Sequence, residues 1–183
     1  MYRRIKSNQF LHTGLSFGSV QKMSIEGRKN SEKCHSKIAK QLFSIMEEKK
    51  TNLCLAADVE ISEKLFNLAE ELGPFICCLK THVDAVSDWH KDSMKNIDRL
   101  KTIAKERNFL LFEDRKFADI GKTVEAQFDS EPYSISQWAD LVTVHGLPGP
   151  GVLDGLNRKG SDCKVIFQID NYGTYLNTSI YET

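Results

Sequence analysis

The chain has 183 residues, of which 25 are basic, 25 are acidic and 40% are hydrophobic. These proportions are typical of an ordinary globular domain and exclude a disordered, collagen-like or disulfide-stabilised chain. The formal net charge of zero also argues against nucleic-acid binding, which usually requires a basic surface. A complete eight-stranded α/β barrel takes roughly 250 residues, so a barrel built from this chain would be short.

The cysteines and the apolar runs bound the class of protein further. No C-x-x-C motif or Cys/His cluster with metal-ligand spacing occurs, so we expect no metal site and a reducing compartment. No apolar run approaches the roughly 18 residues of a membrane span, which predicts a protein that is not embedded in a membrane. The five cysteines are Cys34, Cys54, Cys77, Cys78 and Cys163.

The N-terminal region is basic, and its first acid is Glu26. We expect residues 1–34 to be a loosely ordered leader or linker and residues 35–183 to form the folded domain. The basic bias also resembles a mitochondrial transit peptide, which is the minor alternative to the cytoplasmic location that we expect. The arginine and lysine side chains ahead of the first acid are Arg3, Arg4, Lys6 and Lys22.

Short apolar runs then alternate with segments of helical periodicity. An amphipathic helix over residues 38–46 is predicted to precede the main domain. Strands are predicted over 52–58, 75–79, 109–112, 141–145 and 165–169, and helices over 61–72, 94–104, 120–128 and 152–156. Gly73-Pro74 is predicted to end the second helix, because proline cannot continue a helix and glycine tolerates the cap conformation. This alternation predicts an α/β fold with about five parallel strands, either open or closing toward a barrel.

Charged side chains follow the predicted strands. In parallel α/β folds, ligands gather outside the carboxyl ends of the strands, so we expect these side chains to share one cleft. Strand alternation predicts that Asp114 and Lys116 point to one face while Arg115 points to the other. The side chains at the strand ends are Asp58, Lys80, His82, Asp114, Lys116 and His145.

Single residues of this set also have structural interpretations. Asp58 could cap the helix that follows it, and His82 is more often structural than catalytic. The recurrence of acids and bases at several strand ends instead favours a network that keeps a lysine charged. Such a lysine can donate a proton to a developing carbanion.

Residues 114–123, D-R-K-F-A-D-I-G-K-T, closely resemble the signature D-x-K-x-x-D-[IV]-x-x-T of the orotidine 5′-phosphate decarboxylase family. The resemblance covers about residues 39–156, fades after about residue 160, and looks closest to the decarboxylase half of eukaryotic UMP synthase. It implies an incomplete (β/α)8 barrel that acts as a homodimer. It also implies cofactor-free and metal-free conversion of orotidine 5′-phosphate to UMP and CO2, the last step of pyrimidine nucleotide synthesis.

The resemblance assigns roles to residues that match the signature. Asp58 would hold a ribose hydroxyl, and Lys80 would bridge the ribose and the acid network. Asp114 would face the departing carboxylate, and Lys116 would protonate the pyrimidine carbon. Three further residues would reach the partner subunit's site: Asp119 with a catalytic role, and Ile120 and Thr123 with substrate-binding roles.

Two features depart from the family pattern. Asp170 stands where the family has a serine that contacts the pyrimidine, and the chain ends at Thr183, ahead of the strands that bind the phosphate in the family. We therefore expect a C-terminally truncated barrel. One alternative is a catalytically silent paralogue that binds a full-length subunit through residues 119–123. Another is a different phosphosugar enzyme, such as a pentulose-phosphate epimerase or a hexulose-phosphate synthase.

Overall fold

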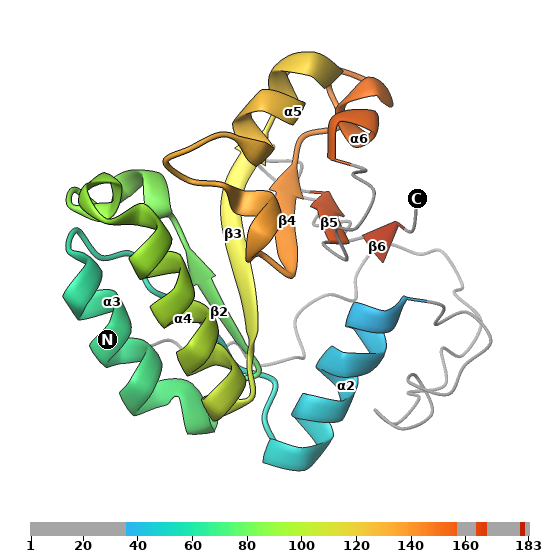
Figure 1. Ribbon diagram of the computed structural model, residues 1–183. Coiled ribbons are helices and arrows are strands. Elements are labelled where there is room, and N and C mark those ends of the chain that lie inside the picture. The colour runs from blue at the N-terminus through green and yellow to red at the C-terminus, as the bar shows by residue number, and fades with distance from the viewer. Residues whose placement is uncertain (1–35, 157–163, 168–179, 182–183) are drawn as a thin grey trace, which may run out of the picture.

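The computed structural model describes residues 36–156 in full and the backbone of residues 164–167 and 180–181 (Figure 1). The predicted leader over 1–34 and the predicted pyrimidine-contact residue Asp170 lie outside these described residues. The helices are α2 (Lys37–Lys49), α3 (Ser62–Leu72), α4 (Ser93–Arg107), α5 (Gly121–Asp129) and α6 (Gly151–Leu156). The strands are β1 (Cys54–Ala56), β2 (Cys78–Thr81), β3 (Leu110–Phe117), β4 (Leu141–Val144), β5 (Lys164–Phe167) and β6 (Ile180–Tyr181).

The strands form a single sheet in the order β1-β2-β3-β4-β5-β6. The first five strands are parallel, which confirms the predicted α/β fold with about five parallel strands. β6 pairs antiparallel with β5 and was not predicted. Since consecutive parallel strands are neighbours, their carboxyl ends all lie at one edge of the sheet. The charged residues that follow the strands are therefore brought to that edge.

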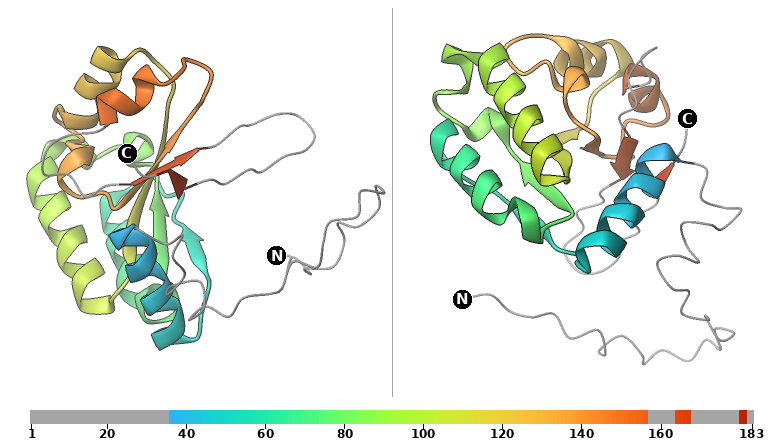
Figure 2. Two further views of the ribbon diagram at one scale, coloured as in Figure 1. Left: turned by 90° about the vertical axis from the view of Figure 1, so that its right-hand side faces the viewer. Right: turned by 60° about the horizontal axis from the view of Figure 1, so that its bottom comes forward.

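Helices cover both faces of the sheet. Figures 1 and 2 show α3 and α4 packed on one face, while α2 crosses the other face near its lower end. The face covered by α3 and α4, here called the outer face, packs against these helices through a large apolar core that includes Phe66, Leu79 and Leu100. A smaller apolar cluster, which includes Ile45 and Leu110, joins α2 to the opposite, inner face of the sheet. Within the described residues, no helix is both long enough and apolar enough to cross a bilayer.

Helix α3 ends at Leu72, which confirms the prediction that Gly73-Pro74 ends this helix. Gly73 keeps a right-handed conformation with φ −47°, and a short 3-10 turn continues over Gly73–Phe75. Glycine is required here by packing, because a Cβ atom built at Gly73 would lie 2.6 Å from Cβ of Arg107. The sequence pattern marked the right residue, but tertiary contact between α3 and α4 explains it.

Replacing Gly73 by alanine is therefore expected to destabilise the fold by about 1–3 kcal/mol, the usual cost of overpacking. Gly151→Ala is the matched control, because a Cβ atom at Gly151 meets nothing within 4 Å. Urea unfolding of both variants measures the difference. Equal unfolding midpoints for the two variants would show that the contact with Arg107 relaxes without cost.

Candidate active site

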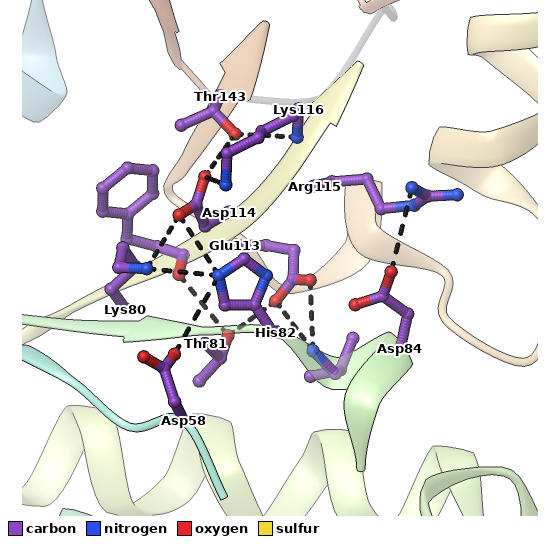
Figure 3. Close-up of polar contacts among 12 residues, drawn as sticks. Asp58, Lys80, Thr81, His82, Asp84, Glu113, Asp114, Arg115, Lys116 and Thr143 are labelled. Atoms are coloured by element: carbon purple, nitrogen blue, oxygen red, sulfur yellow. Dashed lines mark hydrogen bonds and ion pairs between the residues drawn. The ribbon is translucent and has the colours of Figure 1, made fainter. Parts of the chain in front are cut away.

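An acid held between two lysines lies at the carboxyl edge of the sheet (Figure 3). Lys80 Nζ, at the end of β2, lies 2.7 Å from Asp114 Oδ2 on β3. Lys116 Nζ, two residues further along β3, lies 2.9 Å from Asp114 Oδ1. The Asp114 side chain is only 7% exposed, whereas those of Lys80 and Lys116 are 21% and 32% exposed. The two ammonium groups therefore remain accessible to a ligand while the carboxylate is nearly enclosed.

Asp114 remains ionised although it is largely buried. Burial raises its pKa, but hydrogen bonds from Lys80, Lys116 and Thr143 outweigh that effect and lower the pKa of Asp114 to about 2. The carboxylate is thus negatively charged throughout the physiological pH range. Its charge stabilises both ammonium groups, which the predicted chemistry requires.

The backbone of β3 is distorted at Lys116. This residue has φ +54°, in the left-handed region that a non-glycine residue rarely adopts, and the β3–β4 register shifts between Glu113 and Phe117. The backbone N–H of Lys116 donates to Thr143 Oγ1 at 2.8 Å, and Thr143 Oγ1 donates to Asp114 Oδ1 at 2.9 Å. Thr143 on β4 therefore supports both Asp114 and the strained turn that directs Lys116 toward it. Such local strain occurs preferentially at functional sites.

His82 and Asp58 extend this network. His82 Nε2 lies 3.2 Å from Asp114 Oδ2 and 3.3 Å from Lys80 Nζ. It also lies 3.9 Å from Asp58 Oδ1, whose side chain is 65% exposed. Lys80 can donate to Asp114 and to His82 at the same time. His82 therefore belongs to the polar site and is not the purely structural histidine that its sequence context favoured.

Asp58 does not cap the helix that follows it. Helix α3 has Ile61 at its N-cap position, and that residue makes no side-chain cap bond. The N-terminal end of α3 is capped instead by Asp88, whose carboxylate accepts hydrogen bonds from Ser62 N at 2.8 Å and from Ser62 Oγ at 2.9 Å. The capping interpretation of Asp58 is therefore wrong, and its carboxylate faces solvent beside the site.

A second buried acid lies behind Asp114. Glu113 is fully buried on the opposite face of β3, where Oε2 accepts a hydrogen bond from Thr81 Oγ1 at 2.7 Å. Its Oε1 accepts from the backbone N–H of Val83 at 3.1 Å. Burial raises the pKa of Glu113 to about 8, although these hydrogen bonds oppose the rise. Glu113 thus holds the segment that carries His82 from the side opposite to Asp114.

Arg115 points away from the site, as alternation along the strand predicted. Arg115 Nη1 lies 3.8 Å from Asp84 Oδ2, whereas Asp114 and Lys116 contact each other on the other face. The prediction that Asp114 and Lys116 share a face is confirmed. It holds even though the strand is irregular between them.

The remaining predicted residues lie apart from this network in the described part of the chain. Asp119 is exposed, and its Oδ1 accepts a hydrogen bond from the backbone N–H of Ile120 at 2.7 Å. Ile120 is 68% exposed, and Thr123 on α5 is half-buried. His145 follows β4, but its ring joins neither Asp114 nor Lys80 among the contacts of residues 36–156. No group of three or more His, Cys, Asp or Glu side chains in the described residues is arranged to hold a metal ion.

Sequence reasoning missed Thr143 and Glu113. The only signal for Thr143 is a single hydroxyl residue within the otherwise apolar run Leu141–Val144. The signal for Glu113 is an acid that follows an apolar run without a turn residue between them. Neither signal names a partner, because the partners are set by the register of β3 against its two neighbours.

The ion pairs of Asp114 are expected to contribute about 3 kcal/mol to stability at neutral pH, because its pKa falls from about 3.9 in an unfolded chain to about 2 in the fold. This contribution is present above about pH 4 and is lost as the pH falls toward 2. Asp114→Asn should lack it, so its free energy of unfolding should approach that of wild type only at acid pH.

Urea unfolding at a series of pH values from about 2 to 7 measures this difference. Asp98→Asn is the matched control, since Asp98 is an exposed residue of α4 and its side chain lies in no such network. Parallel stability curves for wild type and Asp114→Asn would contradict the predicted linkage.

The fold and the site together define a class of protein. A parallel α/β sheet of barrel type carries an ionised acid between two lysines at the edge where the strands end. Proteins of this class bind their ligands at that edge, with side chains contributed by several strands.

Comparisons with known proteins identify the particular family. The sequence profile of the Orotidine 5′-phosphate decarboxylase / HUMPS family matches residues 51–179. The chain therefore belongs to that family. The matched segment overlaps the expected resemblance over about residues 39–156 and extends beyond it toward the C-terminus.

Curated relatives agree with this assignment. The chain is 49% identical over 127 residues to the orotidine 5′-phosphate decarboxylase of Cyberlindnera jadinii, an alignment that covers 69% of this chain and 47% of that protein. It is 49% identical over 137 residues to the enzyme of Eremothecium gossypii, covering 74% of this chain and 51% of that protein. The chain thus spans about half the length of the curated relatives that it matches.

Solved structures support the fold. The orotidine 5′-monophosphate decarboxylase of Methanocaldococcus jannaschii superimposes with a TM-score of 0.50 at 24% identity, covering 63% of this chain and 53% of that one. A Leishmania donovani UMP synthase superimposes with a TM-score of 0.52 at 17% identity, covering 72% of this chain and 31% of that one. These similarities establish the partial barrel and, at such identities, no more than the fold.

Proposed function

We propose that this chain carries the decarboxylation centre of an orotidine 5′-phosphate decarboxylase, a carboxy-lyase of pyrimidine nucleotide synthesis. The observation that supports the proposal most directly is the position of Asp114 between Lys80 and Lys116, at 2.7 and 2.9 Å. These residues belong to, or pair with, the segment that resembles the family signature. The relatives of nearly half-identical sequence carry the name of that enzyme.

In the proposed reaction, Asp114 and Lys116 act on the pyrimidine. The C–C bond to the substrate carboxylate breaks, CO2 departs, and its electron pair stays on the ring carbon. The ammonium of Lys116 stabilises this carbanion electrostatically and then transfers its proton to the same carbon. Because the two lysine charges are fixed beside Asp114 before substrate binds, little reorganisation is needed as charge develops. The proposed chemistry draws on side chains alone and on no cofactor.

Asp58 and Lys80 are proposed to bind the ribose. The Asp58 carboxylate is 65% exposed and accepts no helix-capping bond, so it is available to a sugar hydroxyl. Lys80 already donates to Asp114 and retains an exposed fraction of 21%. An ammonium group has three N–H donors, so Lys80 can bind substrate without releasing Asp114.

Asp119, Ile120 and Thr123 are proposed to act across a homodimer interface. Asp119 and Ile120 are exposed in the loop between β3 and α5, and Ile120 is a large apolar side chain at 68% exposure. A second subunit would cover this apolar surface and receive the Asp119 carboxylate. The same argument allows pairing with a full-length homologue. We also propose that the protein is located in the cytoplasm.

The test follows the absorbance of orotidine 5′-phosphate with the purified chain, alone and mixed with a full-length homologue whose own catalytic lysine is replaced by alanine. Turnover in either sample that requires Lys116 in this chain would support the proposal. Turnover in neither sample, with dimer formation confirmed by light scattering, would overturn it. If this chain has no turnover of its own but changes the turnover rate of an active full-length homologue, the result would instead indicate the catalytically silent paralogue.

A further inference from the structure

Two cysteines lie side by side on the face of the sheet that carries the site. Cys54 of β1 is the register partner of Cys78 of β2. Adjacent strands are about 4.8 Å apart, and register partners point to the same face. Lys80 lies two residues after Cys78 on β2, so the Lys80 side chain and both thiols point to the same face of the sheet. The thiols therefore lie next to the ion pair between Lys80 and Asp114, toward the start of the strands.

The two thiols have different environments. Cys54 is exposed, whereas Cys78 is buried in the apolar cluster beneath α2 that includes Ile45 and Leu110. A hydrogen bond from the Cys78 thiol lowers the pKa of Cys54, and the charge of Lys80 adds to this effect while burial opposes it. The same hydrogen bond and burial raise the pKa of Cys78. The exposed sulfur is therefore the more acidic of the two, since the pKa of Cys54 is lowered and that of Cys78 is raised.

We propose that Cys54 and Cys78 form a hydroperoxide-reactive dithiol site, with Cys54 as the nucleophile and Cys78 as the resolving thiol. Low thiolate pKa, exposure and an adjacent second thiol are the features that distinguish reactive cysteines from inert buried ones. The site is separate from the proposed decarboxylation chemistry and does not depend on it.

The reaction balances with one equivalent of hydroperoxide. The Cys54 thiolate attacks one peroxide oxygen, the O–O bond breaks, and Cys54 becomes a sulfenic acid as hydroxide, or alkoxide, departs and takes up a proton. The Cys78 sulfur then loses its proton and attacks the Cys54 sulfur. Water leaves and the S–S bond forms. Two thiols are oxidised by two electrons, and the hydroperoxide is reduced by two.

The backbone geometry permits this bond. Disulfides bridge Cα atoms that are about 4.4–6.8 Å apart, a range that includes the usual spacing of neighbouring strands. β1 lies at the edge of the sheet among the described strands, and it is three residues long, so it can shift toward β2. Cys77 is the obvious competitor, but its thiol donates to the Leu53 carbonyl at 3.3 Å and it has no register partner on β1.

The test treats the native chain with hydrogen peroxide, blocks the remaining thiols with iodoacetamide and digests it with trypsin without reduction. Cleavage after lysine yields the peptide 51–64, which contains Cys54, and the peptide 65–80, which contains Cys77 and Cys78. We expect these two peptides to be joined, with a mass two hydrogens below the sum of peptide 51–64 and peptide 65–80 alkylated at Cys77. We also expect Cys54 in the untreated chain to react with iodoacetamide at a lower pH than Cys78, because the pKa of Cys54 is lowered and that of Cys78 is raised.

Variants identify the sulfur atoms involved. Cys77→Ala is the matched control and should still give the joined peptides, whereas Cys78→Ala should give a stable Cys54 sulfenic acid that dimedone traps. Joined peptides that require Cys77 and persist in Cys78→Ala would overturn the proposal. So would unjoined peptides in the peroxide-treated wild type, a result that needs no variant to fold.

Discussion

Replacing Lys116 by alanine is expected to lower the rate of orotidine 5′-phosphate decarboxylation by at least about 10³-fold. The lysine supplies both the proton and the positive charge beside the carbanion, and each of these effects is typically worth about 10² or more. The remaining cation of the pair, Lys80, is held 2.7 Å from Asp114 and is assigned to the ribose. It therefore does not replace the lost proton donor.

The alanine variant isolates the ammonium group from the backbone strain. Lys116 has φ +54°, and alanine pays much the same steric cost there because it also carries a Cβ atom. Lys122→Ala is the control, since Lys122 is an exposed lysine of the neighbouring helix α5. Loss of orotidine 5′-phosphate absorbance measures the rate, and thermal melting checks the fold. A Lys116→Ala chain that keeps wild-type turnover would exclude this lysine as the proton donor.

Replacing Glu113 by glutamine is expected to remove a pH-dependent loss of stability. The pKa of Glu113 is about 8 in the fold and about 4.3 in an unfolded chain, so between these values the folded state binds one more proton than the unfolded state. Stability conferred by this group is therefore complete below about pH 4 and is lost as the pH rises toward 8. The slope approaches about 1.4 kcal/mol per pH unit within that window.

The local hydrogen bonds explain why the neutral side chain fits. A protonated Glu113 can donate to Thr81 Oγ1, whose own hydrogen can turn to the Phe112 carbonyl at 3.4 Å. The other carboxyl oxygen still accepts from Val83 N at 3.1 Å. Glutamine offers the same donor and acceptor and does not ionise. At pH 8 the Glu113→Gln chain should thus be at least as stable as wild type.

Free energies of unfolding in urea, measured from pH 5 to pH 9, test this expectation. Other buried groups titrate in the same range, so the informative quantity is the difference between the Glu113→Gln and wild-type curves. Glu63→Gln is the control, because Glu63 is exposed, pairs with Arg99 and has a lowered pKa that places its titration below this window. Identical slopes for Glu113→Gln and wild type would show that Glu113 is ionised in the fold.

Much of the architecture was predictable because its determinants are local. Apolar runs of strand length, separated by helical periodicity, predicted five parallel strands, and strand alternation predicted that Asp114 and Lys116 share a face. Both predictions are confirmed by the parallel ladders and by the 2.9 Å contact. The alternation argument survived the irregular backbone at Lys116 because Thr143 supports the turn.

Other assignments failed because they depend on residues distant in sequence. The partner that caps α3 is Asp88 and not the nearby Asp58. The helix does end at Gly73 as predicted, but glycine is needed there because of the close approach of Arg107 and not because of the cap conformation. His82 looked structural until the fold placed it 3.2 Å from Asp114. Each contact joins segments more than 20 residues apart, and no local pattern encodes their approach.

The amino-acid sequence was enough to predict the class of fold, the edge of the sheet at which the charged side chains lie, and the family signature over residues 114–123. These follow from side-chain periodicity and from residue types at fixed local spacing. Only the tertiary structure decided which atoms meet. Strand register placed Lys80 and Thr143 against Asp114, Thr81 against Glu113, and Cys54 beside Cys78. Register depends on how whole strands and helices pack, so the shifted pKa values of Asp114 and Glu113 could be explained only after the fold was known.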